Sequence, residues 1–229
     1  MKYITRSLEK VVSQVTKEYP VVLVTGPRQV GKTTMLQKLM EGTNRGYVSL
    51  DDLNERNIAK TDPELFLQLH KPPVLIDEVQ YAPELFTYIK IHVDKTHEPG
   101  AFWLTGSQVF KLMRGVQESL AGRVAVLSLT SLSQAEISGG LITPFTVDME
   151  SLSVRKEERK EADAIDIFER IYKGSMPAIV SGANSNSQIF YSSYLGTYIE
   201  RDVKELSDAI DSLKFLRFIT AVAARCGQM

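Results

Sequence analysis

The sequence predicts an α/β fold of three layers, with a parallel sheet between helices, followed by a helical carboxyl-terminal segment. Over the first 140 residues, five short apolar runs alternate with longer amphipathic segments. The runs are almost entirely apolar, which is typical of strands buried on both faces of a parallel sheet. A glycine-containing loop follows the first run and opens the first amphipathic segment. This alternation of strand and helix is characteristic of α/β domains.

The individual elements follow from these runs in chain order. Strands are expected at residues 21–25, 47–50, 74–76, 101–105 and 124–129. Helices are expected at residues 32–40, 63–69 and 83–96, where apolar residues recur at helical spacing. Pro63 and Pro83 suit the first turn of two of these helices. After residue 163, helical periodicity returns near residues 165–172, 187–206 and 210–225, without a comparable strand signal.

The chain is expected to have three parts. Residues 1–140 form the core domain. Residues 141–162 lack clear periodicity and end in a charged run, so they are expected to be a solvated, mobile linker. Residues 163–229 are expected to form a helical lid and the start of a truncated second domain, because 229 residues amount to about one and a half domains. The apolar face of the last helix should then pack on the core or on another chain; it comprises Phe215, Leu216, Phe218, Ile219 and Val222.

Composition excludes several classes of protein. No run of eighteen apolar residues exists, so no membrane-spanning helix is expected. The one cysteine, Cys226, cannot form a disulfide within the chain, and no signal peptide is evident, so a cytoplasmic protein is expected. With a net charge of -1, the chain as a whole does not have the basic character of a nucleic-acid binder.

The strongest motif runs from Gly26 to Thr34 and matches the phosphate-binding P-loop pattern. Glycines 26 and 31 let the backbone curl so that its N–H groups point at phosphate oxygens, and the helix that follows adds its positive dipole end. Lys32 is expected to reach the β- and γ-phosphates, and Thr33 to place its hydroxyl on Mg²⁺. The nucleotide-binding residues are therefore expected to be Gly26, Pro27, Arg28, Gln29, Val30, Gly31, Lys32, Thr33 and Thr34.

A second motif, Val74 to Glu78, is an apolar strand that ends in two acids, as in a Walker B motif. Asp77 is expected to hold Mg²⁺ through water, because Mg²⁺ keeps much of its hydration shell. Glu78 points differently and is expected to polarise the attacking water as a catalytic residue.

The next strand ends in Thr105, Gly106 and Ser107, followed by Gln108. In P-loop ATPases with an additional strand beside Walker B, that strand ends in a polar sensor of the γ-phosphate or the water. Ser107 and Gln108 are the candidates, with Thr105 behind them. The alternative for Ser107 is that it caps the following helix, and both roles are compatible.

Arg123 precedes the fifth strand and is a candidate arginine finger, acting on its own site or on that of a neighbouring subunit. Arg6, Arg114 and Arg201 compete for this role, and an ordinary surface ion pair is the alternative for each. The three histidines, at positions 70, 92 and 97, show no metal-ligand spacing and are expected to be structural or solvated.

Taken together, the motifs resemble those of a prokaryotic family of AAA-type P-loop ATPases whose core is followed by a C-terminal domain of unknown function. The resemblance rests on the P-loop, Leu50-Asp51-Asp52, Leu75 to Gln80, Leu104 to Ser107, Ser119 to Arg123, Gly174 to Pro177 and Tyr194 to Val203. It implies an ATP–Mg²⁺ site built from Lys32, Thr33, Asp77 and Glu78, and a Walker B strand next to the P-loop strand or one removed from it. Members of the family are usually longer, so most of the C-terminal domain is expected to be absent here.

Three functions are compatible with these motifs. The leading hypothesis is a Mg²⁺-dependent ATPase that acts as a nucleotide-driven switch. The second is a nucleotide-sensing binding module, or a DNA-associated regulator with little turnover, whose nucleic-acid contacts would come from the missing region. A homo-oligomer or a protein partner would assemble through the C-terminal helices. A small-molecule kinase is disfavoured, because Glu78 beside Asp77 suits activation of water rather than its exclusion.

Overall fold

The structure, a computed structural model, describes residues 3–107, 109–140, 146–157, 163–198, 211–226 and 228. Its contacts divide the chain into two compact units, residues 1–181 and 182–229, which are considered separately. The first unit is a three-layer α/β domain, which confirms the predicted fold class.

Five parallel strands form the central sheet in the order β2-β3-β4-β1-β5. Their bounds are β1 Val21–Thr25, β2 Gly46–Ser49, β3 Val74–Asp77, β4 Phe102–Gly106 and β5 Val124–Ser128. All residues of β1, β3 and β4 are buried, as expected of strands covered on both faces. The strand that carries Asp77 is one removed from the P-loop strand, because β4 lies between them.

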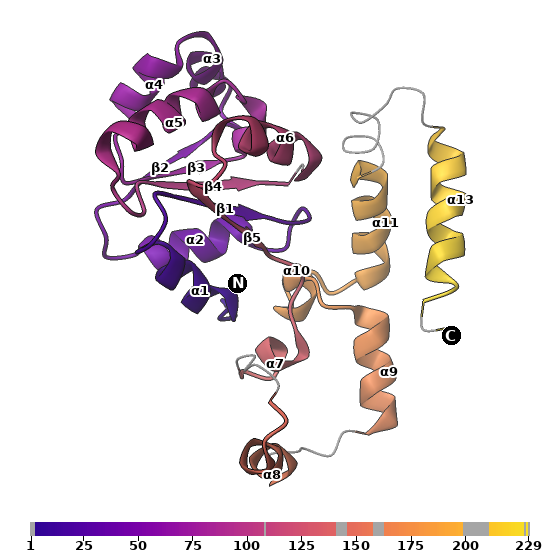
Figure 1. The fold of residues 1–229 in the computed structure, drawn as a ribbon. Coiled ribbons are helices and arrows are strands. Elements are labelled where there is room, and N and C mark those ends of the chain that lie inside the picture. Colours follow the sequence, from indigo (N-terminus) through magenta and orange to yellow (C-terminus); the bar gives the residue numbers. More distant parts are fainter. Residues whose placement is uncertain are drawn as a thin grey trace. The chain divides into compact units, whose positions relative to one another are not determined.

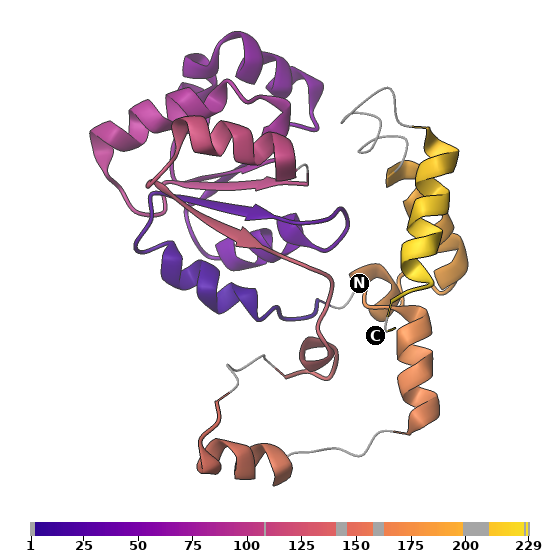
Figure 2. The ribbon, with the colours of Figure 1, turned by 45° about the vertical axis from the view of Figure 1, so that its right-hand side comes forward.

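Helices cover both faces of this sheet (Figures 1 and 2). One face carries α1 Leu8–Val15 and α2 Lys32–Met40. The other carries α3 Leu53–Thr61, α4 Pro63–Leu69, α5 Leu85–Thr96 and α6 Val109–Ser119, together with the short 3₁₀ helix η1 Val79–Tyr81. The hydrophobic core lies mainly between this second layer and the sheet, and its largest buried side chains include Phe66, Phe86 and Phe102.

Helices α1, α3 and α6 were not anticipated from the sequence. Helix α3 buries a single residue, Ala59, so its apolar stripe is too narrow to mark a helix. Its start is instead set by Asp52, whose carboxylate accepts hydrogen bonds from the backbone N–H groups of Asn54 and Glu55. Helix α1 likewise buries only Val12.

The first unit continues past the sheet with α7 Gln134–Ile137, α8 Met149–Glu157, α9 Ala164–Lys173 and α10 Pro177–Val180. The expected irregular linker contains helix α8, whose exposed apolar residues, such as Met149 at 77% and Val154 at 49%, give it no amphipathic signal. The stretch after α9 is joined to the core, because Leu132 N–H donates to Ser175 O and Met176 is buried. The compact unit therefore extends beyond residue 140.

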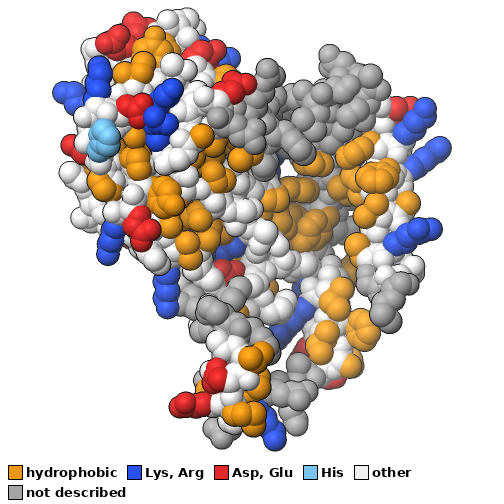
Figure 3. Space-filling model, viewed as in Figure 1, with side chains coloured by type: hydrophobic (Ala, Val, Ile, Leu, Met, Phe, Trp, Pro, Cys, Tyr) orange, Lys and Arg blue, Asp and Glu red, His pale blue; other side chains and the backbone are white. Residues whose placement is uncertain are grey.

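The second unit contains α11 Ser187–Tyr198 and α13 Ser212–Ala223. Neither helix has a buried residue, and Figure 3 shows hydrophobic side chains gathered on the helices of the C-terminal part. Of the expected apolar face of the last helix, Leu216, Phe218 and Val222 are 40%, 61% and 48% exposed, and Phe215 and Ile219 are partly exposed. Packing of this face on the core or on another chain stays a prediction. Among the described residues, no helix combines the length and the apolar character needed to cross a membrane.

Candidate functional site

Three neighbouring strands bring the predicted site residues to one edge of the sheet. The P-loop follows β1, Asp77 is the last residue of β3, and Gly106 is the last residue of β4. Because β3, β4 and β1 are adjacent and parallel, their carboxyl ends meet at the same edge. In open parallel sheets this is the edge at which ligands bind.

The P-loop has the backbone conformation that its glycines permit. Gly26 has a φ of 141°, and a Cβ atom there would collide with the carbonyl oxygen of Leu129. Gly31 has a φ of 92° and lies directly before helix α2 in the left-handed region. Gln29 also has a positive φ, of 61°. The loop therefore depends on glycine at position 26 for both conformation and space.

Lys32 is folded over this loop. Its side chain is buried, at 6% exposed, and Nζ donates to the carbonyl oxygens of Gly26 at 2.9 Å and Pro27 at 2.8 Å. Of the other loop residues, Val30 is buried and Arg28 partly buried, whereas Pro27, Gln29 and Thr34 are exposed. The ammonium group is thus fixed above the loop whose N–H groups would meet a phosphate.

Three hydroxyl groups donate hydrogen bonds to Asp77. Thr33 Oγ1 donates to Asp77 Oδ1 at 2.7 Å, and Thr105 Oγ1 makes a short hydrogen bond to the same oxygen. Tyr47 OH reaches Asp77 Oδ2 at 3.4 Å. Burial raises the pKa of the Tyr47 phenol, and the charge of Asp77 raises it further. The two residues expected to bind metal, Thr33 and Asp77, are therefore in direct contact.

Glu78 follows Asp77 in the left-handed region, with a φ of 56°. Its backbone N–H donates to Thr105 Oγ1 at 3.2 Å. Its carboxylate oxygen Oε2 accepts a short hydrogen bond from Gln80 Nε2 and a long one, 3.5 Å, from Ser107 Oγ. Ser107 therefore lies beside Glu78, as a sensor at this edge would; Gln108 lies outside the described residues.

Arg6 has a position that sequence reasoning missed. Its side chain is 5% exposed and lies against the P-loop, with Nη1 donating to Val30 O at 2.8 Å. Nη2 donates to Thr130 O at 2.8 Å, and Nε lies 3.3 Å from Glu136 Oε1. The Arg6 guanidinium thus supports the P-loop from behind, and its contacts are with protein groups, whereas an arginine finger contacts the phosphate. Its place between Thr5 and Ser7, before α1, gave no sequence signal, because its partners Thr130 and Glu136 are more than a hundred positions away.

Arg123 lies at the wrong edge of the sheet to act on its own site. It immediately precedes β5, so it sits at the amino ends of the parallel strands, opposite the P-loop. There it forms an exposed ion pair with Asp94, with Nη2 3.0 Å from Oδ2. The expectation of a finger acting within the chain is therefore wrong, and a role towards a neighbouring subunit stays a prediction. Arg201 and the side chain of Arg114 lie outside the described residues.

The histidines make ordinary contacts. His70 Nε2 lies 2.7 Å from Glu55 Oε2, and the ring of His92 packs edge-on against Phe102. His97 ends helix α5 with a φ of 56°. Within the described part of the chain, no group of three or more His, Cys, Asp or Glu residues could hold a metal ion by itself.

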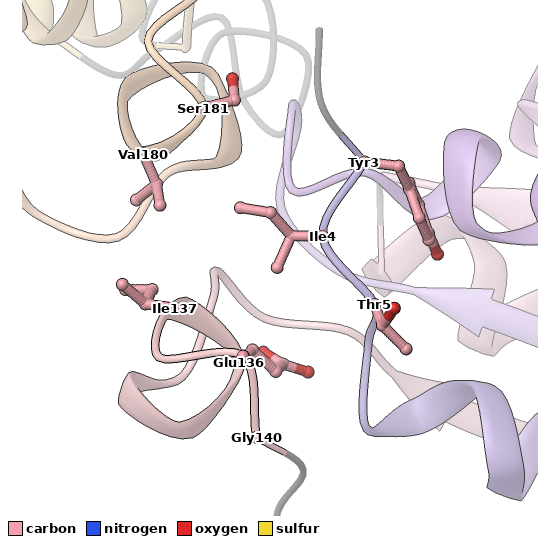
Figure 4. A pocket seen from close by; sticks show the side chains of 9 residues that line it. Tyr3, Ile4, Thr5, Glu136, Ile137, Gly140, Val180 and Ser181 are labelled. Carbon is pink, nitrogen blue, oxygen red and sulfur yellow. The ribbon is translucent and has the colours of Figure 1, made fainter.

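A pocket of about 560 Å³ is lined by Glu136, the ion-pair partner of Arg6, and by the residues that precede Arg6. Three segments line it: residues 3–5 before Arg6, the stretch from Glu136 to Gly140, and Val180 with Ser181. Figure 4 shows the side chains of Ile4 and Val180 pointing into the space between these segments. Ser181 Oγ is buried and has no hydrogen-bond partner among the described residues. The lining therefore combines apolar side chains with the polar residues Tyr3, Thr5 and Glu136.

The fold and this edge of the sheet define a P-loop ATPase architecture. Residues 18–138, more than half of the chain, match the AAA domain family, so the chain belongs to that family. Residues 165–229 match a domain of unknown function (DUF8612). The resemblance drawn from the motifs is thereby confirmed, and family and fold together support nucleotide binding.

Known relatives extend well beyond this chain. It is 31% identical over 211 residues to uncharacterised proteins of Mycobacterium tuberculosis and Mycobacterium bovis, covering 92% of this chain but 42% of their length. Among solved structures, the Walker-type ATPase of Pyrococcus abyssi matches with a TM-score of 0.52 and 15% identity, over 90% of this chain and 77% of that one. That likeness shows the fold.

Proposed function

We propose that this chain binds ATP with Mg²⁺ at the carboxyl edge of the sheet and hydrolyses it. The observation that carries the proposal is the contact of Thr33 with Asp77 beside the P-loop, with Glu78 next in the chain. This contact joins the hydroxyl and the carboxylate that a P-loop site uses for its metal. The carboxylate that would receive a proton from water is one residue away.

The two protein oxygens fit a Mg²⁺ ion whose other ligands are phosphate and water oxygens. Thr33 and Asp77 offer oxygen atoms, which Mg²⁺ prefers, and this ion usually takes only one or two protein ligands besides phosphates and water. Thr33 would hold Mg²⁺ directly and Asp77 through water. When bound, Mg²⁺ neutralises charge on the phosphate oxygens.

The pocket lined by residues 3–5, Glu136 and Val180 is the proposed place of the nucleoside. Arg6 connects its wall to the loop, because it follows Thr5 in the chain and donates to Val30 O. Apolar side chains such as Ile4, Ile137 and Val180 (Figure 4) suit the faces of a planar base. ATP would then span from this pocket to Lys32.

Hydrolysis in this arrangement is the in-line attack of water on the γ-phosphorus. A bond forms between the water oxygen and phosphorus, and the bond to the bridging oxygen breaks, which leaves ADP and phosphate. Glu78 accepts the proton of the attacking water. Lys32 and the loop amides stabilise the charge on the phosphate oxygens, and Ser107 senses the γ-phosphate.

A switch function is supported by the path from the P-loop to the stretch after α9. Arg6 donates to Val30 O and also to Ser131 O, at 3.3 Å. Ser175 Oγ donates to Ser131 Oγ at 2.8 Å, so Arg6 and the Gly174–Pro177 motif meet at the same residue. We propose that nucleotide state shifts this stretch and the helices beyond it.

A second candidate is a nucleotide-sensing module with little turnover. Two protein donors, Gln80 and Ser107, engage Glu78 Oε2, which would favour this candidate if Oε2 were the oxygen that must accept the proton from water. A cytoplasmic location, protein partners, and nucleic-acid contacts through a longer C-terminal region stay predictions.

Equilibrium binding of ATP with Mg²⁺ tests the proposed site. Lys32→Ala should abolish measurable binding, because it removes the charge fixed above the loop. Lys38→Ala is the matched control, since Lys38 lies on the same helix but is exposed and paired with Glu41. Equal ATP affinity in the Lys32 variant and the control would contradict the proposed site.

A further inference from the structure

We infer that Gln80 is a positioning residue, which holds the Glu78 carboxylate in the direction needed to receive a proton from water. This inference rests on the proposed ATPase function and assigns a role to a residue outside the P-loop and the acid pair. Gln80 lies in η1, two residues after Glu78, and is 7% exposed. Its Nε2 donates to Glu78 Oε2.

Glu78 needs such support because of where its backbone turns. With a φ of 56° its backbone leaves the β3 direction immediately after Asp77, so Glu78 is not held by the strand that fixes Asp77. The hydrogen bond from Glu78 N–H to Thr105 Oγ1 fixes the backbone only. A glutamate side chain has several freely rotating bonds, and holding one rotamer requires a partner at the carboxylate.

Gln80 is itself fixed by the end of β4. A Cβ atom at Gly106 would collide with Gln80 Oε1 and with Leu112, so glycine at this position leaves the room that the amide occupies. The Gln80 amide thus lies between Gly106, at the end of β4, and the carboxylate of Glu78, which follows β3. Its orientation is also determined, because the reverse one would turn its oxygen towards the carboxylate.

Within the described part of the chain, the acceptor atom of the Gln80 amide makes no hydrogen bond that would explain the residue by stability. Gln80 Oε1 is buried and has no hydrogen-bond partner among the described residues. Most buried polar atoms have a hydrogen-bond partner, so an acceptor without a protein partner at this place is unusual. Here the donor end is used on Glu78 and the acceptor end is left unused.

The consequence concerns which oxygen of Glu78 meets water. Within the described residues, the hydrogen bonds to this carboxylate, from Gln80 and Ser107, both end on Oε2. Oε1 is then the oxygen that accepts the proton. Gln80 acts through Glu78, so its loss should slow the chemical step without weakening ATP binding.

Gln80→Met tests this inference, because methionine has a similar shape and no donor. We expect kcat for ATP hydrolysis to fall about 10- to 100-fold, as for a misplaced catalytic group. KM, the equilibrium affinity for ATP with Mg²⁺ and the melting temperature should stay as in the wild type. Gln68→Met, at an exposed glutamine of α4, is the control and should change nothing.

A double-mutant comparison separates positioning from a structural role. In the Glu78→Gln background, Gln80→Met should cause no further loss of residual turnover, since the group through which it acts is already removed. If Gln80→Met does not fold, Gln80→Asn keeps the amide but withdraws it by one methylene and should lower kcat in the same way.

The outcomes are distinguishable from those of the proposed function. A wild type without ATP turnover would overturn the proposed hydrolysis and this inference together. A wild type that hydrolyses ATP, with unchanged or raised kcat in the Gln80 variants, would overturn this inference alone. Parallel loss of ATP affinity and melting temperature would also overturn it, because it would show a structural role.

Discussion

The two edges of the sheet each carry an arginine–carboxylate pair, and the pairs differ in burial. Arg6 and Glu136, at the carboxyl edge, have side chains that are each 5% exposed. Arg123 and Asp94, at the amino edge, are 33% and 43% exposed. The buried pair also binds backbone groups of several segments, among them Val30 O and Ser7 N–H. The exposed pair makes one further bond, from Arg123 to the nearby carbonyl of Ala121.

The difference in burial indicates that Arg6, and not Arg123, supports the P-loop site. A buried charge must have every partner in place, because leaving it unpaired in a low dielectric is costly. An exposed pair is screened by water and contributes little. The motif position of Arg123 suggested a catalytic arginine, whereas the residue that contacts the P-loop is Arg6.

The largest expected effect is that of Arg6→Ala. Removing this side chain leaves Glu136 buried without its ion pair and the carbonyls of Val30 and Thr130 without their donor. We expect the free energy of unfolding to fall by about 3–5 kcal/mol, as for other broken buried pairs. Urea unfolding measures it, and ATP affinity should fall as well because the loop is no longer braced. If Arg6→Ala lowered the free energy of unfolding no more than Arg123→Ala does, the buried and the exposed ion pair would not differ as described.

A smaller effect concerns the pH dependence of stability. Burial alone would raise the pKa of Glu136, but hydrogen bonds from the N–H groups of Ser133 and Ser7 and the charge of Arg6 outweigh it, so the pKa is lowered. A carboxylate with a lowered pKa stabilises the fold above its unfolded-state pKa, and this contribution is lost as the pH falls through the folded-state pKa. Glu136→Gln should therefore be less stable at neutral pH and lose less stability on acidification.

Urea unfolding at several pH values from neutral to about pH 3 measures how the free energy of unfolding changes with pH, since carboxylates titrate in this range. Asp94→Asn is the matched control, because Arg123 lowers the pKa of Asp94 through a hydrogen bond while both groups stay exposed. A Glu136→Gln variant whose stability changed with pH as steeply as the wild type would show that Glu136 does not carry this dependence.

The smallest effect is expected for Arg123→Ala. The exposed pair with Asp94 should contribute so little that the melting temperature and ATP turnover of the isolated chain stay close to the wild type. Thermal unfolding and phosphate release measured at low protein concentration test this expectation. A concentration-dependent loss of turnover would support the neighbouring-subunit role that the sequence suggested, and loss at every concentration would contradict the account.

The sequence was sufficient for the parts of the molecule that local pattern determines. Helices 32–40 and 63–69 and strand 21–25 were predicted to the residue, because a P-loop glycine, a capping proline and a β-branched run mark their ends. Thr33 and Asp77 were predicted to hold the same Mg²⁺, because the P-loop and Walker B motifs assign both to it, and the structure places them in contact. Helix α8 was missed because its apolar residues face solvent without a stripe.

The rest depends on contacts between distant segments. Arg6 reaches Thr130 across 124 positions, and no local pattern reports such a pair. Gln80 lies within the Leu75–Gln80 motif, but the sequence does not show its role. That role depends on the space left by Gly106, which only the packing of β3 beside β4 reveals. Arg123 was misjudged for another reason: its predicted place directly before the fifth strand already put it at the amino edge of a parallel sheet, opposite the P-loop.

Hydrolysis by Glu78 is the central claim, and phosphate release by Glu78→Gln beside the wild type tests it most directly. ATP affinity is measured on the same samples, so that binding and turnover are separated. We predict that the variant binds ATP with Mg²⁺ as the wild type does, while its turnover falls by a factor of about 100 to 10,000, as on removal of a general base. Turnover at the wild-type rate in a variant that binds ATP would contradict the assignment of Glu78.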